Sequence, residues 1–168
     1  AHDALLDAFG QKTAERYLVW RDYQEPEKPV IVLLGGTAGV GKTTIALEVA
    51  RRLGISRVIS TDSIRQVMRI MLSSDLMPAI HASSFDAHRE MPGIFGEEDS
   101  VIEGFVAQVS AVSVGVRAII DRAVDENASL VLDGVALVPG LIDLSRYEGR
   151  AHVFFQVVAR FDPSSMQQ

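Results

Sequence analysis

The sequence contains no cysteine, which excludes disulfide bridges and thiolate metal sites. A chain without thiols suits a reducing compartment, and we expect a cytoplasmic protein. An excess of positive charge is also lacking, because 16 Lys and Arg residues stand against 22 Asp and Glu residues. No basic stripe stands out that could neutralise a run of phosphates, so we expect no nucleic-acid partner.

Long apolar runs are missing as well. No uninterrupted apolar stretch approaches the roughly 20 residues that span a bilayer, and we expect no membrane association. What the sequence does contain is 168 residues with 48% apolar content, the size of one globular domain that can bury a core. The composition favours no particular oligomeric state.

Strand-like and helix-like segments alternate along the chain. Apolar runs rich in β-branched residues predict strands at about 30–35, 57–60, 129–133 and 151–158. Helical spacing of apolar residues predicts a helix from Leu5 to Trp20 and a long one along a stripe from Ile102 to Ala123. A helix is also predicted from the loop after the first strand to the stop signal Gly54, and another from an N-cap at Thr61 and Asp62 to about Met71. The stretch from Ser73 to Asp99 predicts an irregular lobe with one short helix.

Strands separated by helices predict parallel pairing with right-handed crossovers. The expected fold is therefore a three-layer α/β arrangement with a mostly parallel sheet flanked by helices. Residues 1–29 are expected to form an N-terminal helix and linker, and residues 30–168 a single domain.

A glycine-rich motif separates the first predicted strand from its helix. Residues Gly36 to Thr43 read GTAGVGKT and fit G-x-x-x-x-G-K-[ST] at every fixed position, in the strand-before, helix-after context that the motif requires. Glycines let backbone N–H groups surround phosphate oxygens, and the helix N-terminus adds partial positive charge. The alternative is a glycine-rich turn of another α/β fold. The prediction is a loop that binds a nucleoside triphosphate through Gly36, Thr37, Ala38, Gly39, Val40, Gly41, Lys42, Thr43 and Thr44.

Within that loop two side chains have distinct expected roles. Lys42 is expected to reach the β and γ phosphates, and Thr43 to offer its hydroxyl to Mg²⁺. Two carboxylates, Asp62 and Asp133, follow the second and third predicted strands, and the carboxyl ends of parallel strands share one edge of a sheet. Taken singly, Asp62 also fits a helix N-cap, and Asp133 fits a turn residue before Gly134.

Three stretches of the chain resemble the 2-phosphoglycerate kinases. They are LLGGTAGVGKTTIALEVARRLGISRVISTDSIRQVMR, MPAIHASSFDA and LVLDGVALVPG, in this order. The segment AERYLVWRDYQEPEKP resembles the one that leads into the kinase core of that family. The resemblance covers about residues 14–140 and implies a P-loop small-molecule kinase with its third strand beside the first and its second strand beyond the third. It also implies ATP-dependent transfer, with Mg²⁺, of the γ-phosphoryl group to the free hydroxyl of 2-phosphoglycerate, giving 2,3-bisphosphoglycerate.

The implied strand order separates the two carboxylates. Strands lie about 4.8 Å apart, so Asp62 would end roughly 10 Å from the P-loop and Asp133 only one strand away. Asp133 is then suited to a Mg²⁺-bound water near Thr43, which completes the expected metal site, and Asp62 to accepting the proton of the acceptor hydroxyl. We therefore expect Lys42, Asp62 and Arg65 to be catalytic residues.

The phosphorylated acceptor needs cationic and polar contacts of its own. Arg65 and Arg69 share the helix face of Asp62 and could hold a doubly anionic molecule, although Arg69 equally fits a solvated surface charge. His81, Ser83 and Ser84 are candidates for the acceptor pocket, with a structural role as the alternative for His81.

The chain departs from the family pattern in two ways. Asp133 stands where glutamate is usual, and Ala136 stands where histidine is usual. Family members also continue past the fourth strand into an arginine-bearing lid, a fifth strand and an adenine-side loop, so we expect this chain to be part of a catalytic unit. Two alternatives remain: a P-loop kinase for another small hydroxylated anion, and a nucleotide-binding regulatory domain without turnover.

Overall fold

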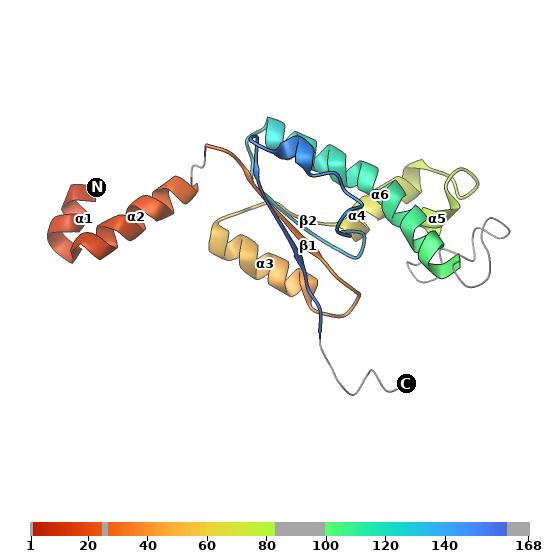
Figure 1. Cartoon of the computed structure of the whole chain (residues 1–168), viewed down its shortest axis with the longest axis horizontal. Helices are drawn as coiled ribbons and strands as arrows, with labels where there is room; N and C mark the ends of the chain where they lie inside the picture. The colour runs from red at the N-terminus through yellow and green to blue at the C-terminus, as the bar shows by residue number, and fades with distance from the viewer. Residues whose placement is uncertain (1, 25–26, 83–99, 161–168) are drawn as a thin grey trace.

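A computed structural model describes residues 2–24, 27–82 and 100–160 of the chain. Its elements are drawn in Figure 1. In chain order they are α1 (His2–Phe9), α2 (Gln11–Gln24), β1 (Val30–Gly35), α3 (Lys42–Leu53), β2 (Val58–Ser60), α4 (Thr61–Met71), α5 (Pro78–His81), α6 (Ser100–Asp125), β3 (Leu130–Asp133), the 3-10 helix η2 (Ser145–Tyr147) and β4 (His152–Val157).

The strands form one parallel sheet in the order β2-β3-β1-β4. This confirms the α/β fold class, and each strand begins and ends within one residue of its predicted bounds. The third strand lies beside the first and the second lies beyond it, as the family resemblance implies. Asp133 pairs in register with Leu34 of β1 on one side and with Ser60 of β2 on the other, so the loops after three strands open at one edge.

Helices cover both faces of the sheet, and Figure 1 shows α3 and α6 on opposite sides of the strands. Successive side chains of the buried strand β1 point to opposite faces of the sheet and enter two separate hydrophobic cores. Val30, Val32 and Leu34 pack with Ala46 and Ala50 of α3. Ile31 and Leu33 point the other way, into a larger core shared with α4, α5 and α6. The result is a three-layer arrangement with the sheet in the middle.

The long helix α6 confirms most of the predicted apolar stripe. Val109, Val112 and Val116 are buried, whereas Ile102 near the start of the helix is 66% exposed. The segment Val101–Asp125 is long and apolar enough to cross a membrane by length and composition. Its buried side packs into the core described above, which is the environment of a core helix. A Cβ on Gly115 would lie 2.5 Å from Ile64, so this glycine allows α4 to cross α6 closely.

The single helix predicted from Leu5 to Trp20 is wrong, because the chain forms two helices there. The break falls at Gly10, whose φ of +79° favours glycine over any residue with a Cβ. Its N–H donates to the Leu6 carbonyl and its carbonyl accepts from Ala14, so Gly10 ends one helix and starts the next. Apolar spacing continues through the break, which is why periodicity alone missed it. The division into residues 1–29 and 30–168 stays a prediction.

Tyr147 is a core residue that the sequence pattern did not reveal. It lies in η2 with no exposed surface, and its hydroxyl donates to Asp121 of α6 at 2.9 Å. Burial, reinforced by the hydrogen bond to Asp121, raises the pKa of Tyr147 to about 12. This contact ties the segment between β3 and β4 to α6.

Replacing Tyr147 by Phe removes that bond while keeping the ring. We expect a loss of about 1 kcal/mol, which lowers the melting temperature by about 2–4 °C in a domain of this size. Because the phenol is neutral until its raised pKa, the difference from wild type is complete below pH 10 and shrinks as pH rises toward 12. Thermal unfolding followed by circular dichroism measures it. Equal melting temperatures at pH 7 would show that the bond contributes nothing.

Candidate active site

The loop that joins β1 to α3 has the backbone of a phosphate cradle. Gly36, Gly39 and Gly41 all have positive φ, at +139°, +78° and +86°. A Cβ on Gly36 would lie 2.2 Å from the Val158 carbonyl oxygen, so that position admits only glycine. Gly41 is the N-cap of α3, and no side chain of the described residues caps this end of the helix. The first N–H groups of α3 are therefore available for phosphate oxygens.

Lys42 folds back over this loop. It is 8% exposed, and its ammonium donates to the Thr37 carbonyl across the loop. A buried ammonium needs oxygen partners, and phosphate oxygens entering the cradle would supply stronger ones than a single carbonyl. The position supports the predicted contact of Lys42 with the β and γ phosphates.

Thr43 and Asp133 meet beside the cradle. The Thr43 hydroxyl donates to Asp133 Oδ2 at 2.8 Å, and Asp133, at the end of β3, is only 3% exposed. Hard oxygen ligands suit Mg²⁺, and an octahedral ion with bonds of 2.0–2.1 Å places neighbouring ligands about 2.9 Å apart. The spacing of these two oxygens thus fits adjacent ligands of one Mg²⁺ ion.

The rest of such a coordination sphere would come from phosphates and water. Within the described residues no cluster of three or more His, Asp or Glu side chains could hold a metal by itself. Mg²⁺ in phosphoryl-transfer sites characteristically uses one or two protein ligands, phosphate oxygens and several waters. The donor set at Thr43 and Asp133 matches that pattern.

Asp62 lies in the first turn of α4, directly after β2, and Arg65 lies one turn further along the helix. Arg65 Nη2 donates to Asp62 Oδ1 at 3.2 Å, and the Asp62 side chain is 67% exposed. The predicted cap at Thr61 and Asp62 is wrong: Ser60 is the N-cap, and its hydroxyl oxygen accepts from the Ser63 N–H at 3.1 Å. Asp62 is therefore not needed to cap the helix.

Close packing brings the starts of α4 and of the β3 loop together. A Cβ on Gly134 would lie 1.8 Å from the Thr61 hydroxyl oxygen, so glycine is required immediately after Asp133. Thr61 is itself 2% exposed. Asp133 and Asp62 consequently share one edge of the sheet, with β3 between the P-loop strand and β2.

The remaining predicted site residues divide into three cases. Arg69 is half-buried in the last turn of α4, and its role stays a prediction. His81 Nε2 lies 2.8 Å from the Leu72 carbonyl, which can only accept, so Nε2 carries a proton and joins α5 to the end of α4. This contact favours the structural alternative for His81. Ser83 and Ser84 lie outside the described residues.

Sequence analysis missed Gln108, a buried polar residue of α6. It is 2% exposed, and its amide nitrogen donates to the carbonyls of Ala79 and Ala82 on the α5 segment. One signal for it was present: a lone amide interrupts the apolar stripe immediately before Val109.

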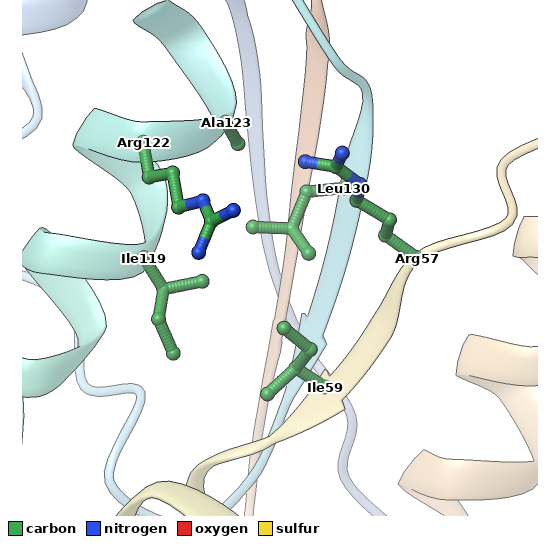
Figure 2. A pocket seen from close by; sticks show the side chains of 6 residues that line it. All are labelled: Arg57, Ile59, Ile119, Arg122, Ala123 and Leu130. Atoms are coloured by element: carbon green, nitrogen blue, oxygen red, sulfur yellow. The ribbon is translucent and has the colours of Figure 1, made fainter. Parts of the chain in front are cut away.

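A pocket of about 310 Å³ lies at the opposite end of the sheet, where Arg57 precedes β2 and Leu130 begins β3. Figure 2 shows Arg57 and Arg122 extending toward Leu130 from the two sides of this pocket. Both guanidinium groups are bonded to Glu126, and hydrogen bonds from Arg122 and then Arg57 lower the pKa of that carboxyl. The pocket is therefore separate from the P-loop edge, and its arginines are held in ion pairs.

The fold and the P-loop edge together define a P-loop domain of the small-molecule kinase type. No protein-family model matches the chain, and no solved structure matches it. Curated proteins do: the chain is 42% identical over 159 residues to a 2-phosphoglycerate kinase of Pyrococcus horikoshii, covering 95% of this chain and 52% of that protein. The chain belongs to the 2-phosphoglycerate kinase family.

Further relatives agree on the same name. A 2-phosphoglycerate kinase of Pyrococcus furiosus is 44% identical over 159 residues, covering 95% of this chain and 51% of the relative. A 2-phosphoglycerate kinase of Methanothermobacter thermautotrophicus is 46% identical over 135 residues, covering 78% of this chain and 43% of the relative. The chain spans about half the length of the curated relatives it matches.

Proposed function

We propose that this chain forms the nucleotide-binding and acceptor-activating part of an ATP-dependent kinase. The reaction is transfer of the γ-phosphoryl group to the free hydroxyl of 2-phosphoglycerate, which gives 2,3-bisphosphoglycerate. The observation that carries the proposal is the shared sheet edge, where the Thr43–Asp133 pair adjoins the P-loop and the Asp62–Arg65 pair follows β2. Relatives named 2-phosphoglycerate kinase support the choice of acceptor.

On the donor side, the cradle and Lys42 bind the triphosphate of ATP. The N–H groups of the loop and of the first turn of α3 hold phosphate oxygens, and the Lys42 ammonium neutralises charge on the β and γ phosphates. Mg²⁺ would be held by Thr43 Oγ1 and Asp133, and when bound it supplies charge neutralisation to the transferred group. Because Asp133 is buried and bonded to Thr43, these ligands are ordered before any ion arrives.

On the acceptor side, Asp62 accepts the proton of the attacking hydroxyl. The hydroxyl oxygen forms a bond to the γ phosphorus, the bond from that phosphorus to the β–γ bridging oxygen breaks, and ADP leaves. The Asp62 carboxylate, two residues after β2, is exposed and is not needed to cap α4, since Ser60 does so, which leaves it able to take this role. Arg65 retains further N–H donors for the phosphate or carboxylate of the acceptor.

The test is an assay of ADP release by the protein in its full natural length. With ATP and Mg²⁺ present, we expect 2-phosphoglycerate to raise ADP release well above the rate that the enzyme shows without an acceptor, toward the typical enzyme turnover of about 10 s⁻¹. Stimulation by another small hydroxylated anion instead would overturn the acceptor, with Ala136 as the first residue to examine. ATP binding without any acceptor-stimulated turnover would indicate a nucleotide-binding regulatory domain.

The setting of the enzyme belongs to the same proposal. A cytoplasmic location, a small-molecule acceptor and the lack of a nucleic-acid or membrane partner remain predictions, and the oligomeric state is open. Gel filtration of the full-length protein would give its oligomeric state and reveal co-eluting nucleic acid. Fractionation of cells that express it would test the location and the absence from membranes.

A further inference from the structure

The short helix α5 is tied to its neighbours by three side chains. His81 bonds to the Leu72 carbonyl at the end of α4, Arg65 reaches from α4 to the Ala82 carbonyl, and Gln108 reaches from α6 to the carbonyls of Ala79 and Ala82. Arg65 also donates to Asp62. The end of α5 is therefore connected directly to the proposed acceptor side of the site.

We propose that Gln108 is a positioning residue that sets the place of the Arg65 guanidinium. The inference rests on the proposed function, because it takes Arg65 as a group that binds the acceptor. Gln108 acts through the Ala82 carbonyl, which accepts from both Gln108 and Arg65.

Both N–H donors of the Gln108 amide are committed to α5. Its nitrogen lies 2.6 Å from the Ala79 carbonyl oxygen and 3.1 Å from the Ala82 carbonyl oxygen. An amide buried to this extent, at 2% exposure, is stable only when its polar atoms are bonded. The amide therefore holds the last turn of α5 at a fixed distance from α6.

The Ala82 carbonyl passes this constraint on to Arg65. Its oxygen accepts from Gln108 Nε2 at 3.1 Å and from Arg65 Nη1 at 2.8 Å, which fills both of its lone pairs. The other terminal nitrogen of the guanidinium, Nη2, donates to Asp62 Oδ1 at 3.2 Å. The backbone oxygen of Ala82 and the Asp62 carboxylate thus orient one rigid planar group, and they leave its other donors for a ligand.

Without this orientation, binding of the acceptor would have to restrict the Arg65 side chain. A free arginine side chain carries about 2 kcal/mol of rotamer entropy, most of which a bound acceptor would have to remove. Arg65 has a side-chain exposure of 20%, already confined between α4 and the end of α5. With the Ala82 carbonyl released, the guanidinium would lose one of the two oxygens that orient it.

Gln108→Met tests the proposal, because methionine has a similar length and no N–H donor. In the full-length protein we expect kcat/KM for 2-phosphoglycerate to fall about 10–100-fold, while the ATP dissociation constant changes less than about twofold. Ser113→Ala is the matched control: Ser113 is also buried on α6, at 5% exposure, but within the described part of the chain its hydroxyl bonds only to the Ser110 carbonyl of its own helix. It should change neither value.

A double-mutant cycle separates positioning from a general structural role. When Arg65 is already Ala, Gln108→Met should lower kcat/KM by less than about twofold, because the group that it positions is absent. If the losses of kcat/KM caused by Gln108→Met and by Arg65→Ala simply multiply in the double variant, the proposal is overturned. If Gln108→Met does not unfold cooperatively, Gln108→Asn replaces it in the cycle, since its shorter amide cannot reach both carbonyls.

A spectroscopic readout keeps this test independent of turnover. In protein labelled with ¹⁵N-arginine, the Arg65 Nε–H signal should shift or broaden in Gln108→Met and stay in place in Ser113→Ala. An unchanged Arg65 signal in folded Gln108→Met would overturn the positioning role. Lack of 2-phosphoglycerate turnover in the wild type would instead overturn the proposed function, and the Arg65 signal would still decide whether Gln108 positions it.

Discussion

Asp62→Asn is expected to lower phosphoryl transfer to 2-phosphoglycerate by about 10²–10⁴-fold and to leave ATP affinity almost unchanged. The amide keeps the shape of the carboxylate but cannot accept the proton of the acceptor hydroxyl. Helix capping does not enter the result, because Ser60 is the N-cap of α4. Steady-state kinetics measure the transfer, and calorimetric titration measures ATP binding.

The matched control for this variant is Asp75→Asn. Asp75 is an exposed carboxylate in the turn between α4 and α5, so the control makes the same chemical change on the same part of the fold. It should keep wild-type turnover. Full turnover in Asp62→Asn would show that Asp62 takes no part in proton transfer, and a parallel loss of ATP affinity would place it on the donor side.

Lys42→Ala should weaken ATP binding about 10–100-fold, because losing hydrogen bonds to a charged group costs about 1.5–3 kcal/mol. Transfer should fall by a further factor of about 10²–10³, since the ammonium also neutralises charge that develops on the γ phosphate. The position of Lys42 over the loop, 8% exposed and bonded to the Thr37 carbonyl, motivates both effects.

Calorimetric titration of ATP and Mg²⁺ into the wild type and Lys42→Ala measures the first effect. Lys12→Ala in α2 removes an exposed lysine far along the chain from the loop and should bind ATP like the wild type. Equal ATP affinities in wild type and Lys42→Ala would contradict the assignment of the nucleotide site.

Much of the fold follows from local patterns in the sequence. The strands of a parallel sheet are buried on both faces, so β1 and β3 appear as short apolar runs that end in Gly or Asp. Errors arose where one residue's backbone conformation or side-chain bond decides the structure. Gly10 ends a helix inside a continuing apolar pattern, and Ser60 caps α4 although Thr61 and Asp62 have equally suitable side chains.

The site shows the same division between local and distant contacts. The P-loop is recognisable because its glycines, Lys42 and Thr43 act within eight consecutive residues, and Asp62 with Arg65 has helical spacing. The Arg65–Ala82 and Gln108–Ala82 bonds join residues 17 and 26 positions apart. They form only once α4, α5 and α6 have packed together, so no spacing rule predicts them.

The most direct test of the central claim follows phosphorus by ³¹P NMR in a mixture of the full-length protein, ATP, Mg²⁺ and 2-phosphoglycerate. The shared edge of Thr43, Asp133, Asp62 and Arg65 predicts that each ADP formed is matched by one new phosphate ester on the acceptor, which then carries two phosphates. Formation of ADP with inorganic phosphate alone, at the same rate with and without 2-phosphoglycerate, would contradict it.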